Sequence, residues 1–368
     1  MPARPGLVAT AVCAALTLAA CSGGAAAQEA VGTPEPAGTP TRPPVTAPAA
    51  PAAAAVPADA VVTAEPVPTG TATLAVAGDV HFEGVSGRAL AEGIGPAADL
   101  LAAADLAVVN LETAVTDRGT PAPKTYLFRT DDRAFDVLAD AGVDAVSLAN
   151  NHAMDYGVLG LHDTLTAAED AGVQVIGAGR DEDAAYAPLR TTVDGLDVSV
   201  LAVTDVLDTF AIDAWVARGD RPGMASAKGT DEARLLRAVR QEAAAADVVV
   251  VVAHWGREYE ACPTDRQIQL ADALAEAGAD AVVGSHAHVP LPAERRPDGV
   301  YVHYGLGNFV FYAVREPARS SGVLTLEVGA DGVQDARWQP MRITDGLPYP
   351  TGPQQDAAAG WAPPGSTC

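Results

Sequence analysis

Hydrophobic residues between about residues 71 and 290 come in short runs, and each run ends in polar residues. The runs read TATLAVAGD, DLAVVNLE, DAVSLANNH, VQVIGAG, LDVSVLAVTD, DVVVVVAHWG and ADAVVGSHAHV. Nearly continuous Val, Ile and Ala is typical of strands that are buried on both faces. Segments with helical spacing alternate with these runs, at residues 157–171, 231–246 and 265–278. The pattern predicts an α/β protein with a layered β-sheet core and helices on both sides.

The pattern changes after residue 300. VYVHYGLGNFVFY and GVLTLEV read as strands with no long helix between them, which favours antiparallel pairing. Residues 21–70 are mainly Ala, Pro, Thr and Gly and cannot bury enough apolar surface to fold, so we expect a disordered tether. Residues 346–368 have a similar composition and are expected to form a loose tail. The folded domain should therefore span residues 71–345.

The N-terminus has the features of an export signal. Arg4 precedes an apolar stretch from residue 7 to residue 20, which is too short to span a membrane. LAAC at residues 18–21 resembles the lipobox of bacterial lipoproteins, which predicts a signal peptide over residues 1–20 and lipidation of Cys21. The chain would then be extracytoplasmic and anchored to the cell membrane by lipid. A plain secretory signal cut near the same place is the alternative.

Cysteine usage adds little chemistry. With Cys13 in the signal and Cys21 lipidated, Cys262 and Cys368 remain. They could pair in an oxidising exterior, but the sequence leaves their geometry open. Two cysteines so far apart exclude a CxxC-type metal site.

Charge narrows the partners. The 368 residues include 47 acidic and 23 basic side chains, for a net charge of -24. This balance disfavours nucleic acid, which requires clustered Lys and Arg. It also disfavours an anionic substrate unless a bound cation reverses the local field.

Candidate chemistry gathers where the predicted strands end. Five runs end in carboxylate, amide or imidazole side chains, and ligands of α/β sheets bind at the carboxyl ends of strands. These side chains are Asp79, His81, Asn110, Glu112, Asn150, Asn151, His152, His254, His286 and His288. Imidazole and carboxylate without thiolate suit Zn, Mn or Fe.

Spacing supports a site for two ions. Asp79 and His81 are two residues apart, as are His286 and His288, so each pair could reach one ion from an extended backbone. A carboxylate shared by both ions could hold them about 3.5–4 Å apart. Each motif alone fits a turn or a core residue, but their recurrence at strand ends indicates one site. The other histidines, His162 and His303, fit structural roles within a helix and a strand.

Several motifs carry a resemblance to a known family. AGDVHFEG, NLETAVT, KTYLFR, LANNHAMDYGVLGLHDTL, AHWGREYE, VVGSHAHV and VHYGLGNFVF occur in this order between residues 71 and 330. They resemble the CapA family of bacterial capsule and poly-γ-glutamate synthesis proteins, within the calcineurin-like metallophosphoesterase superfamily. The resemblance implies a calcineurin-like metallophosphoesterase fold and two divalent metal ions. It also implies the ligands Asp79, His81, Asn151, His254, His286 and His288, with His152 as a catalytic general acid or charge stabiliser.

The chain departs from the family pattern at two places. The superfamily has a Gly-Asp pair after the second strand, whereas this chain reads VNLE. Either Glu112 bridges the two metals or Asn110 replaces the carboxylate more weakly, and we favour Glu112 because an anion bridges two cations best. The second departure is Ser285 and Ala287 beside His286 and His288, which leaves both imidazoles in place.

Two classes of function remain open. One is a metal-dependent hydrolase or transferase for a phosphoester or a capsule or cell-envelope polymer, with Lys124 and Arg257 holding an anionic substrate. Alternatively, Lys124 and Arg257 are ordinary surface charges. The other class is a non-catalytic accessory that binds, exports or anchors an anionic polymer beside capsule-synthesis membrane proteins. An extracytoplasmic phosphoesterase of unrelated substrate is a further alternative.

Overall fold

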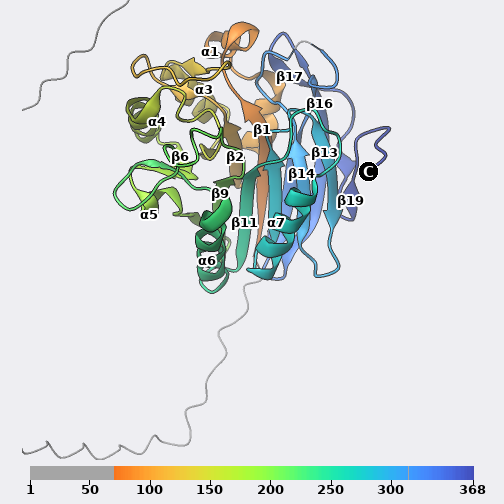
Figure 1. The fold of residues 1–368 in the computed structure, drawn as a ribbon. Helices are drawn as coiled ribbons and strands as arrows, with labels where there is room; N and C mark the ends of the chain where they lie inside the picture. Colours follow the sequence, from red (N-terminus) through yellow and green to blue (C-terminus); the bar gives the residue numbers. More distant parts are fainter. Residues whose placement is uncertain (1–69, 314) are drawn as a thin grey trace, which may run out of the picture. The chain divides into compact units, whose positions relative to one another are not determined.

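Two β-sheets form the centre of the molecule. The structure, a computed structural model, describes residues 70–313 and 315–368 (Figure 1). The first sheet has the strand order β17-β16-β15-β1-β2-β5-β6, with β18 paired to β16. Its strands are β1 (Thr71–Val80), β2 (Leu106–Leu111), β5 (Ala145–Ser147), β6 (Gln174–Ile176), β15 (Ser320–Gly329), β16 (Gly332–Thr344), β17 (Leu347–Pro350) and β18 (Gln355–Asp356). The strands β1, β2, β5 and β6 run parallel, and β15 and β16 add antiparallel pairs.

The second sheet has the order β19-β13-β14-β12-β11-β9-β8. Its strands are β8 (Leu189–Val193), β9 (Leu196–Thr204), β11 (Val248–His254), β12 (Ala281–Ser285), β13 (Pro290–Arg295), β14 (Tyr301–Leu306) and β19 (Gly360–Trp361). The inner strands β9, β11, β12 and β14 are parallel. Short pairs lie outside the two sheets: β3 (Ala114–Val115) with β4 (Arg129–Thr130), and β7 (Ala178–Gly179) with β10 (Gly223–Met224).

Alternating side chains explain the layers. On β1, Leu74 and Val76 belong to the hydrophobic core between the two sheets, which also contains Val250 of β11. Ala75 and Ala77 point the other way, into a core shared with helices. Both faces of each sheet are therefore buried, as the continuous apolar runs predict.

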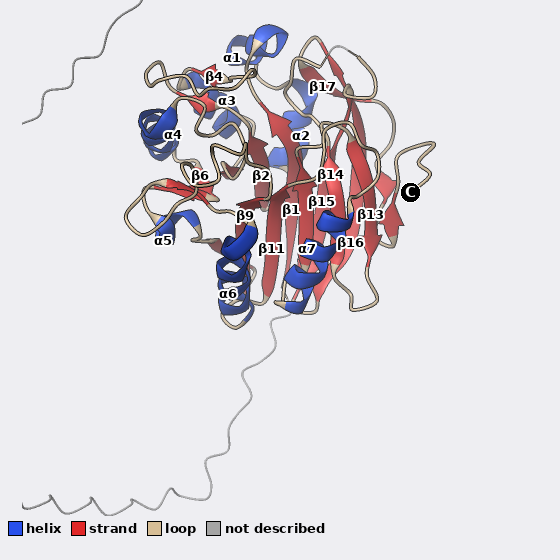
Figure 2. Ribbon diagram, viewed as in Figure 1, coloured by secondary structure: helices blue, strands red, loops and turns tan. Residues whose placement is uncertain are grey.

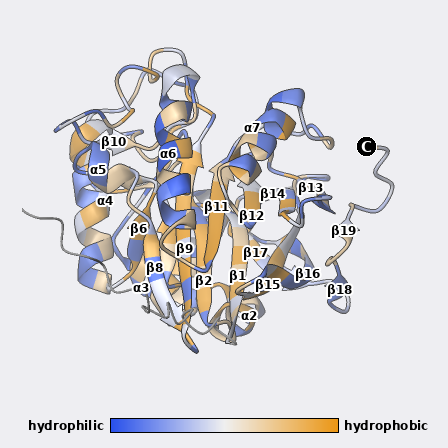
Figure 3. Ribbon diagram, turned by 90° about the horizontal axis from the view of Figure 1, so that it is seen from below, coloured by the Kyte–Doolittle hydropathy of each residue, from blue (hydrophilic) through white to orange (hydrophobic). Residues whose placement is uncertain are grey.

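Helices cover the outer face of each sheet (Figure 2). The helices are α1 (Ala89–Glu92), α2 (Ala98–Ala102), α3 (Arg133–Asp140), α4 (Gly157–Ala171), α5 (Glu182–Ala185), α6 (Glu232–Ala243) and α7 (Asp265–Glu276), with 3₁₀ turns η1 (Gly84–Arg88), η2 (Gly95–Ala97) and η3 (Gly229–Asp231). Side chains of α1 to α4 pack on the first sheet, and those of α6 and α7 on the second. Hydrophobic β9 and β11 lie inside, while α6 and α7 carry hydrophilic residues (Figure 3). The predicted α/β class with a layered core is confirmed.

The end of the chain differs from the expected loose tail. Strand β17 pairs with β16, and Leu347 and Ala357 are buried. Strand β19 pairs with β13 and brings Trp361 against the core between the sheets. A disulfide joins Cys368 to Cys262. Composition was misleading here because strands of two to four residues carry almost no pattern, and their partners are distant in the sequence.

The signal peptide, Cys21 and the tether predicted for residues 1–70 lie almost wholly outside the described residues. Within residues 70–313 and 315–368, no helix is long and apolar enough to cross a membrane.

Candidate metal centre

Strands from both sheets deliver polar side chains to one place. In the first sheet, Asp79 on β1 lies beside Asn110 on β2, and Glu112 follows directly. In the second sheet, His254 ends β11 beside Ser285, which ends β12. Both pairs are parallel, so their carboxyl ends meet at the same edge, as expected for a ligand site.

The side chains form two groups with metal-binding geometry. Glu112, His254 and His286 make one group, and Asp79, Glu112 and His288 make the other, with the ligand atoms of each group within 4.8 Å of one another. Glu112 Oε1 lies 3.5 Å from His254 Nε2. On the other side, His288 Nδ1 lies 3.1 Å from Asp79 Oδ2. Glu112 is the member that both groups share.

Unpartnered polar atoms show that these residues fit a pair of cations. Both carboxylate oxygens of Glu112, Nδ1 of His286 and Nε2 of His81 are buried without a hydrogen-bond partner among the described residues. Burying such atoms without a partner costs free energy. Carboxylate and imidazole are the donors that Zn, Mn and Fe accept. The donor set therefore fits two divalent ions.

The electrostatics of the cluster are unfavourable without positive charge. Burial, and then the neighbouring Asp79, raise the pKa of Glu112 well above its usual range. Burial also holds the pKa values of His254 and His286 well below theirs. For His288, burial is outweighed by Glu112 and Asp79, which raise its pKa to about 9. The two carboxylates thus favour the protonated form of His288, and a divalent cation would satisfy them more fully.

His81 packs among three aromatic rings at the side of the cluster and belongs to neither three-residue group. Its ring centroid lies 3.8 Å from that of Phe311, 4.5 Å from Tyr312 and 4.6 Å from Phe128. Its Nδ1 accepts a hydrogen bond from the backbone N–H of Glu83. This bond places any proton or metal contact of His81 at Nε2, the unpartnered atom.

Asn110 belongs to neither of the two groups but hydrogen-bonds to residues of the cluster. Its Nδ2 donates to Asp79 Oδ1 at 2.8 Å and lies 3.2 Å from His254 Nδ1. Its Oδ1 accepts from Asn150 Nδ2. Asn151 lies closer to the first group, with Oδ1 2.8 Å from His254 Nε2. Glu112 therefore has the position that a bridging carboxylate would need, while Asn110 contacts its neighbours Asp79 and Asn150.

The backbone is strained where the second sheet meets the cluster. His286 and His288 have φ values of 85° and 58°, a region that L-residues rarely adopt. Strain of this kind persists only where surrounding contacts enforce it. Here the His286 N–H donates to Asp79, and His288 Nδ1 lies 2.8 Å from Asn308 Oδ1. The strained turn directs both imidazoles into one site.

His152 stands next to the cluster in a buried ion-pair network. Its Nδ1 lies 2.7 Å from Asp155 Oδ2, and its Nε2 lies 4.0 Å from Glu112 Oε1. Lys124 Nζ lies 2.9 Å from Asp155 Oδ1 and donates to the carbonyl of Asn151. Burial first of all lowers the pKa of His152, although Asp155 opposes this. Lys124 is thus brought to the site, with its charge directed at Asp155.

Arg257 lies to one side of the cluster. Its side chain is 72% exposed and pairs with Glu260. It lines a neighbouring pocket of about 540 Å³ with Asp205, Lys228 and Arg266. The structure thus separates the two predicted substrate-binding cations.

Sequence reasoning missed two site residues. Asp155 follows His152 by three residues in NNHAMD, and that spacing was the available signal. Asn308 follows β14 in the motif GLGNFVF, so its position just after a strand could have identified it, as it did for the other site residues.

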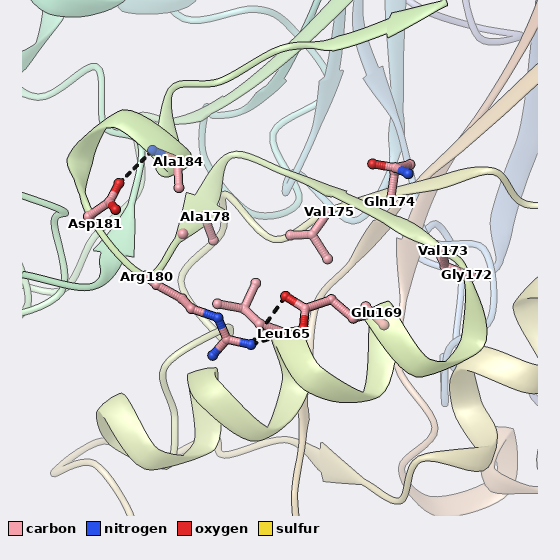
Figure 4. Close-up of a pocket in the computed structure, with 12 residues that line it drawn as sticks. Leu165, Glu169, Gly172, Val173, Gln174, Val175, Ala178, Arg180, Asp181 and Ala184 are labelled. Carbon is pink, nitrogen blue, oxygen red and sulfur yellow. Dashed lines mark hydrogen bonds and ion pairs between the residues drawn. The ribbon is translucent and has the colours of Figure 1, made fainter.

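Another pocket, of about 520 Å³, lies between α4 and the β6–β7 segment (Figure 4). Its charged residues are engaged locally, because Arg180 pairs with Glu169 and Asp181 caps the backbone of Ala184. It lacks the histidines and carboxylate groups of the strand ends and does not compete with them as a reaction site.

The chain is similar to known bacterial proteins. The family described as "Bacterial capsule synthesis protein PGA_cap" matches residues 73–313. The PGA biosynthesis protein CapA of Bacillus subtilis (strain 168) is 34% identical over 251 residues, which cover 67% of this chain and 64% of that protein. The capsule biosynthesis protein CapA of Bacillus anthracis is 33% identical over 214 residues, covering 58% and 51%. The match thus spans between about half and two thirds of the length of these relatives.

Solved structures include a distant likeness. The crystal structure titled as a novel phosphatase from Mycoplasma pneumoniae has a TM-score of 0.46 and 14% sequence identity, covering 74% of this chain and 94% of that one.

Proposed function

Because the chain belongs to the PGA_cap family of bacterial capsule synthesis proteins, we propose that it is a metal-dependent hydrolase or transferase in the synthesis of a capsule or cell-envelope polymer. The observation that carries the proposal is the place of Glu112, the one carboxylate shared by two buried groups of metal-ligand type. A shared carboxylate is what a two-metal hydrolytic site requires.

The residues that would hold the ions divide between the sheets. Glu112, His254 and His286, with Asn151, would hold one ion; Asp79, Glu112 and His288, with His81, would hold the other. Two divalent ions supply Lewis acidity and a strong nucleophile at neutral pH. The metals would be Mn, Zn or Fe by the chemistry of the donors.

His152 would act as the general acid or base that transfers a proton to the leaving group. The Asp155 carboxylate accepts a hydrogen bond from Nδ1–H of His152, which leaves Nε2 of His152 facing the cluster as an acceptor. A neutral imidazole in this tautomer can take up a proton there and return it to a leaving group. Lys124 Nζ lies 2.9 Å from Asp155 Oδ1 and so places a positive charge beside this buried carboxyl group. Phe128 stacks on the imidazole and fixes its plane.

We place the enzyme outside the cytoplasm on a lipid anchor at Cys21. LAAC at residues 18–21 supports this placement. The Cys262–Cys368 disulfide supports it independently, because such bonds persist in oxidising compartments. An anchored enzyme would meet its polymer or phosphoester substrate at the membrane surface, beside membrane proteins of capsule synthesis.

The test is turnover by the full chain loaded with Mn or Zn. We expect hydrolysis of an aryl phosphate ester or of a γ-linked glutamate chain. His152→Ala should lower kcat by about 10²-fold or more while metal content is retained. Two bound metals without turnover of either substrate would instead favour the accessory role, in which the ions bind a polymer carboxylate. No bound metal would contradict both.

A further inference from the structure

Three tyrosines belong to segments that lie beside the metal centre. Tyr259 is 57% exposed, and its ring centroid lies 6.0 Å from that of His288. Tyr312 is half-buried and lies 4.5 Å from His81. Tyr126 is 64% exposed and lies two residues before Phe128, whose ring stacks on that of His152. We call Tyr126, Tyr259 and Tyr312 the tyrosine rim.

Within the described residues, a carboxylate without an ion-pair partner, Glu258, lies next to the tyrosine rim in the chain. Glu258 is exposed, directly precedes Tyr259, whose ring lies beside that of His288, and has no ion-pair partner among the described residues. The cations are engaged elsewhere: Lys124 pairs with Asp155, and Arg257 pairs with Glu260. Of the two cations predicted to hold a substrate, neither is without a partner, so we expect the metal ions to supply the positive charge for a substrate.

The loop that carries Glu258 and Tyr259 is held in place. The Tyr259 N–H donates to the carbonyl of Ala287, between the two site histidines. Tyr259 itself has a φ of 62°, which needs such enforcement. Farther along, Cys262 is tied to Cys368. Glu258 and Tyr259 thus stand on a fixed segment, and their charge and shape are available before substrate binds.

We propose that Glu258 and the tyrosine rim restrict the substrate to a phosphate ester of an uncharged, ring-bearing alcohol. This rests on the proposed function, since the phosphate would bind at the metal centre. The rings of Tyr126 and Tyr259 pack against the apolar face of the alcohol, and Glu258 repels any further carboxylate. A run of γ-linked glutamates places one carboxylate on every residue, so the rim disfavours it as the directly bound substrate.

The experiment compares two esters that differ by one charge. The metal-loaded full chain is given 4-nitrophenyl phosphate and the same ester with a carboxylate on the ring. We expect kcat/KM to favour the uncharged ester by about 10-fold, the size of a like-charge contact near a protein surface. Glu258→Gln should remove most of this preference by lowering KM for the carboxylated ester. Tyr259→Leu should raise KM for the uncharged ester. A sugar phosphate in a third arm distinguishes a sugar ring from an aryl ring.

Matched controls lie in the same loop and on the far strand β17. Glu260→Gln removes an exposed carboxylate that already pairs with Arg257, and Tyr349→Leu removes an exposed tyrosine on β17. Neither should change the preference. Calorimetry gives a second readout without turnover: inorganic phosphate should bind more tightly than a γ-linked glutamate pentamer, and Glu258→Gln should narrow that gap.

The outcomes separate the two proposals. Turnover without preference, or pentamer binding tighter than phosphate and indifferent to Glu258→Gln, would overturn the role of the rim while leaving the enzyme intact. If neither ester reacts, the proposed hydrolysis is wrong, and calorimetry alone decides whether the rim discriminates by charge.

Discussion

At the scale of single residues, the two candidates for the bridge differ in charge and in position. Glu112 has two unpartnered buried oxygens, whereas both polar atoms of Asn110 are engaged with Asp79 and Asn150. The sequence was enough to prefer Glu112, because a bridge between cations calls for an anion. The sequence was not enough to predict that Asn110 connects Asp79 to Asn150, because side-chain hydrogen bonds between strands leave no pattern within one strand.

Glu112→Gln should weaken the binding of at least one metal ion by about 10-fold or more, since it removes the shared charge. Elemental analysis after dialysis against a weak chelator, followed by metal titration, measures the effect. Asn110→Ala is the comparison and should cost less, because it removes orientation and no charge. If metal content were unchanged in Glu112→Gln but lost in Asn110→Ala, the assignment of Glu112 as the bridging residue would be wrong.

His303 provides a separate residue-scale prediction, far from chemistry. It is fully buried between the rings of Trp338 and Trp361, and neither of its ring nitrogens has a partner within the described chain. Burial lowers its pKa to about 3. The unfolded chain, with a pKa of about 6.5, then binds a proton that the folded chain refuses. Stability should fall as the pH drops from about 6.5 towards 3, by up to about 1.4 kcal/mol per pH unit.

His303→Phe keeps a ring between the two tryptophans and removes the titration. The free energy of unfolding of this variant, measured by denaturant at several pH values, should vary less between pH 6.5 and 4 than that of the unmodified chain. Parallel curves for the two proteins would show that His303 does not control the acid response. His162→Phe, on the partly exposed face of α4, is the control.

At the scale of elements, segments with a continuous apolar run or with helical spacing were predictable, and segments without such a pattern were not. The sequence indicated β1, β2, β9, β11, β12 and the helices α4, α6 and α7 because each buries a whole face or stripe. It missed β13, which starts with Pro290, and the eight-residue helix α3. It also missed β16, whose exposed and buried residues alternate irregularly and whose position depends on pairing with β15. Tertiary pairing decides such segments.

The loop between β11 and α7 depends on the disulfide at its centre. Cys262 and Cys368 are 106 residues apart, so the bond restricts a large part of the unfolded chain. Cys262→Ser with Cys368→Ser should lower the free energy of unfolding by about 2–4 kcal/mol. Guanidinium denaturation of the double variant and of the oxidised parent measures the difference. Equal midpoints would mean that β19 and the end of the chain are held by pairing alone.

At the scale of the whole molecule, the predicted tether would separate the proposed lipid anchor from the folded domain. If Cys21 carries lipid, Cys21→Ser should move the protein from the membrane fraction to the soluble fraction. The domain should keep its melting temperature, because its hydrophobic cores lie within the described residues, which begin at residue 70. Fractionation and thermal melting test the two halves of the prediction. A variant that remains with the membrane would refute the lipobox assignment.

The sequence could not show that the predicted strands divide between two sheets. The sequence predicted which strand ends come together at the site. Continuous apolar runs, however, look alike whether helices or another sheet cover the second face of a sheet. The division matters for the site, because Asp79 and Glu112 come from the first sheet and His254, His286 and His288 from the second. Each proposed ion would therefore have ligands from both sheets.

Ions that join two sheets should stabilise the whole molecule and not only its active site. A ligand that binds only the folded state adds about 2.7 kcal/mol of stability at a concentration 100 times its Kd. For a domain of this size, that corresponds to a rise in Tm on the order of 5 °C. We expect Mn or Zn to raise Tm by this amount and a chelator to reverse it, as followed by calorimetry. Glu112→Gln should remove most of the rise, because Glu112 belongs to both groups, whereas Glu260→Gln should leave it intact. A Tm that is indifferent to metal in the parent chain would mean that the two sheets are joined at this edge by the histidines and carboxylates alone.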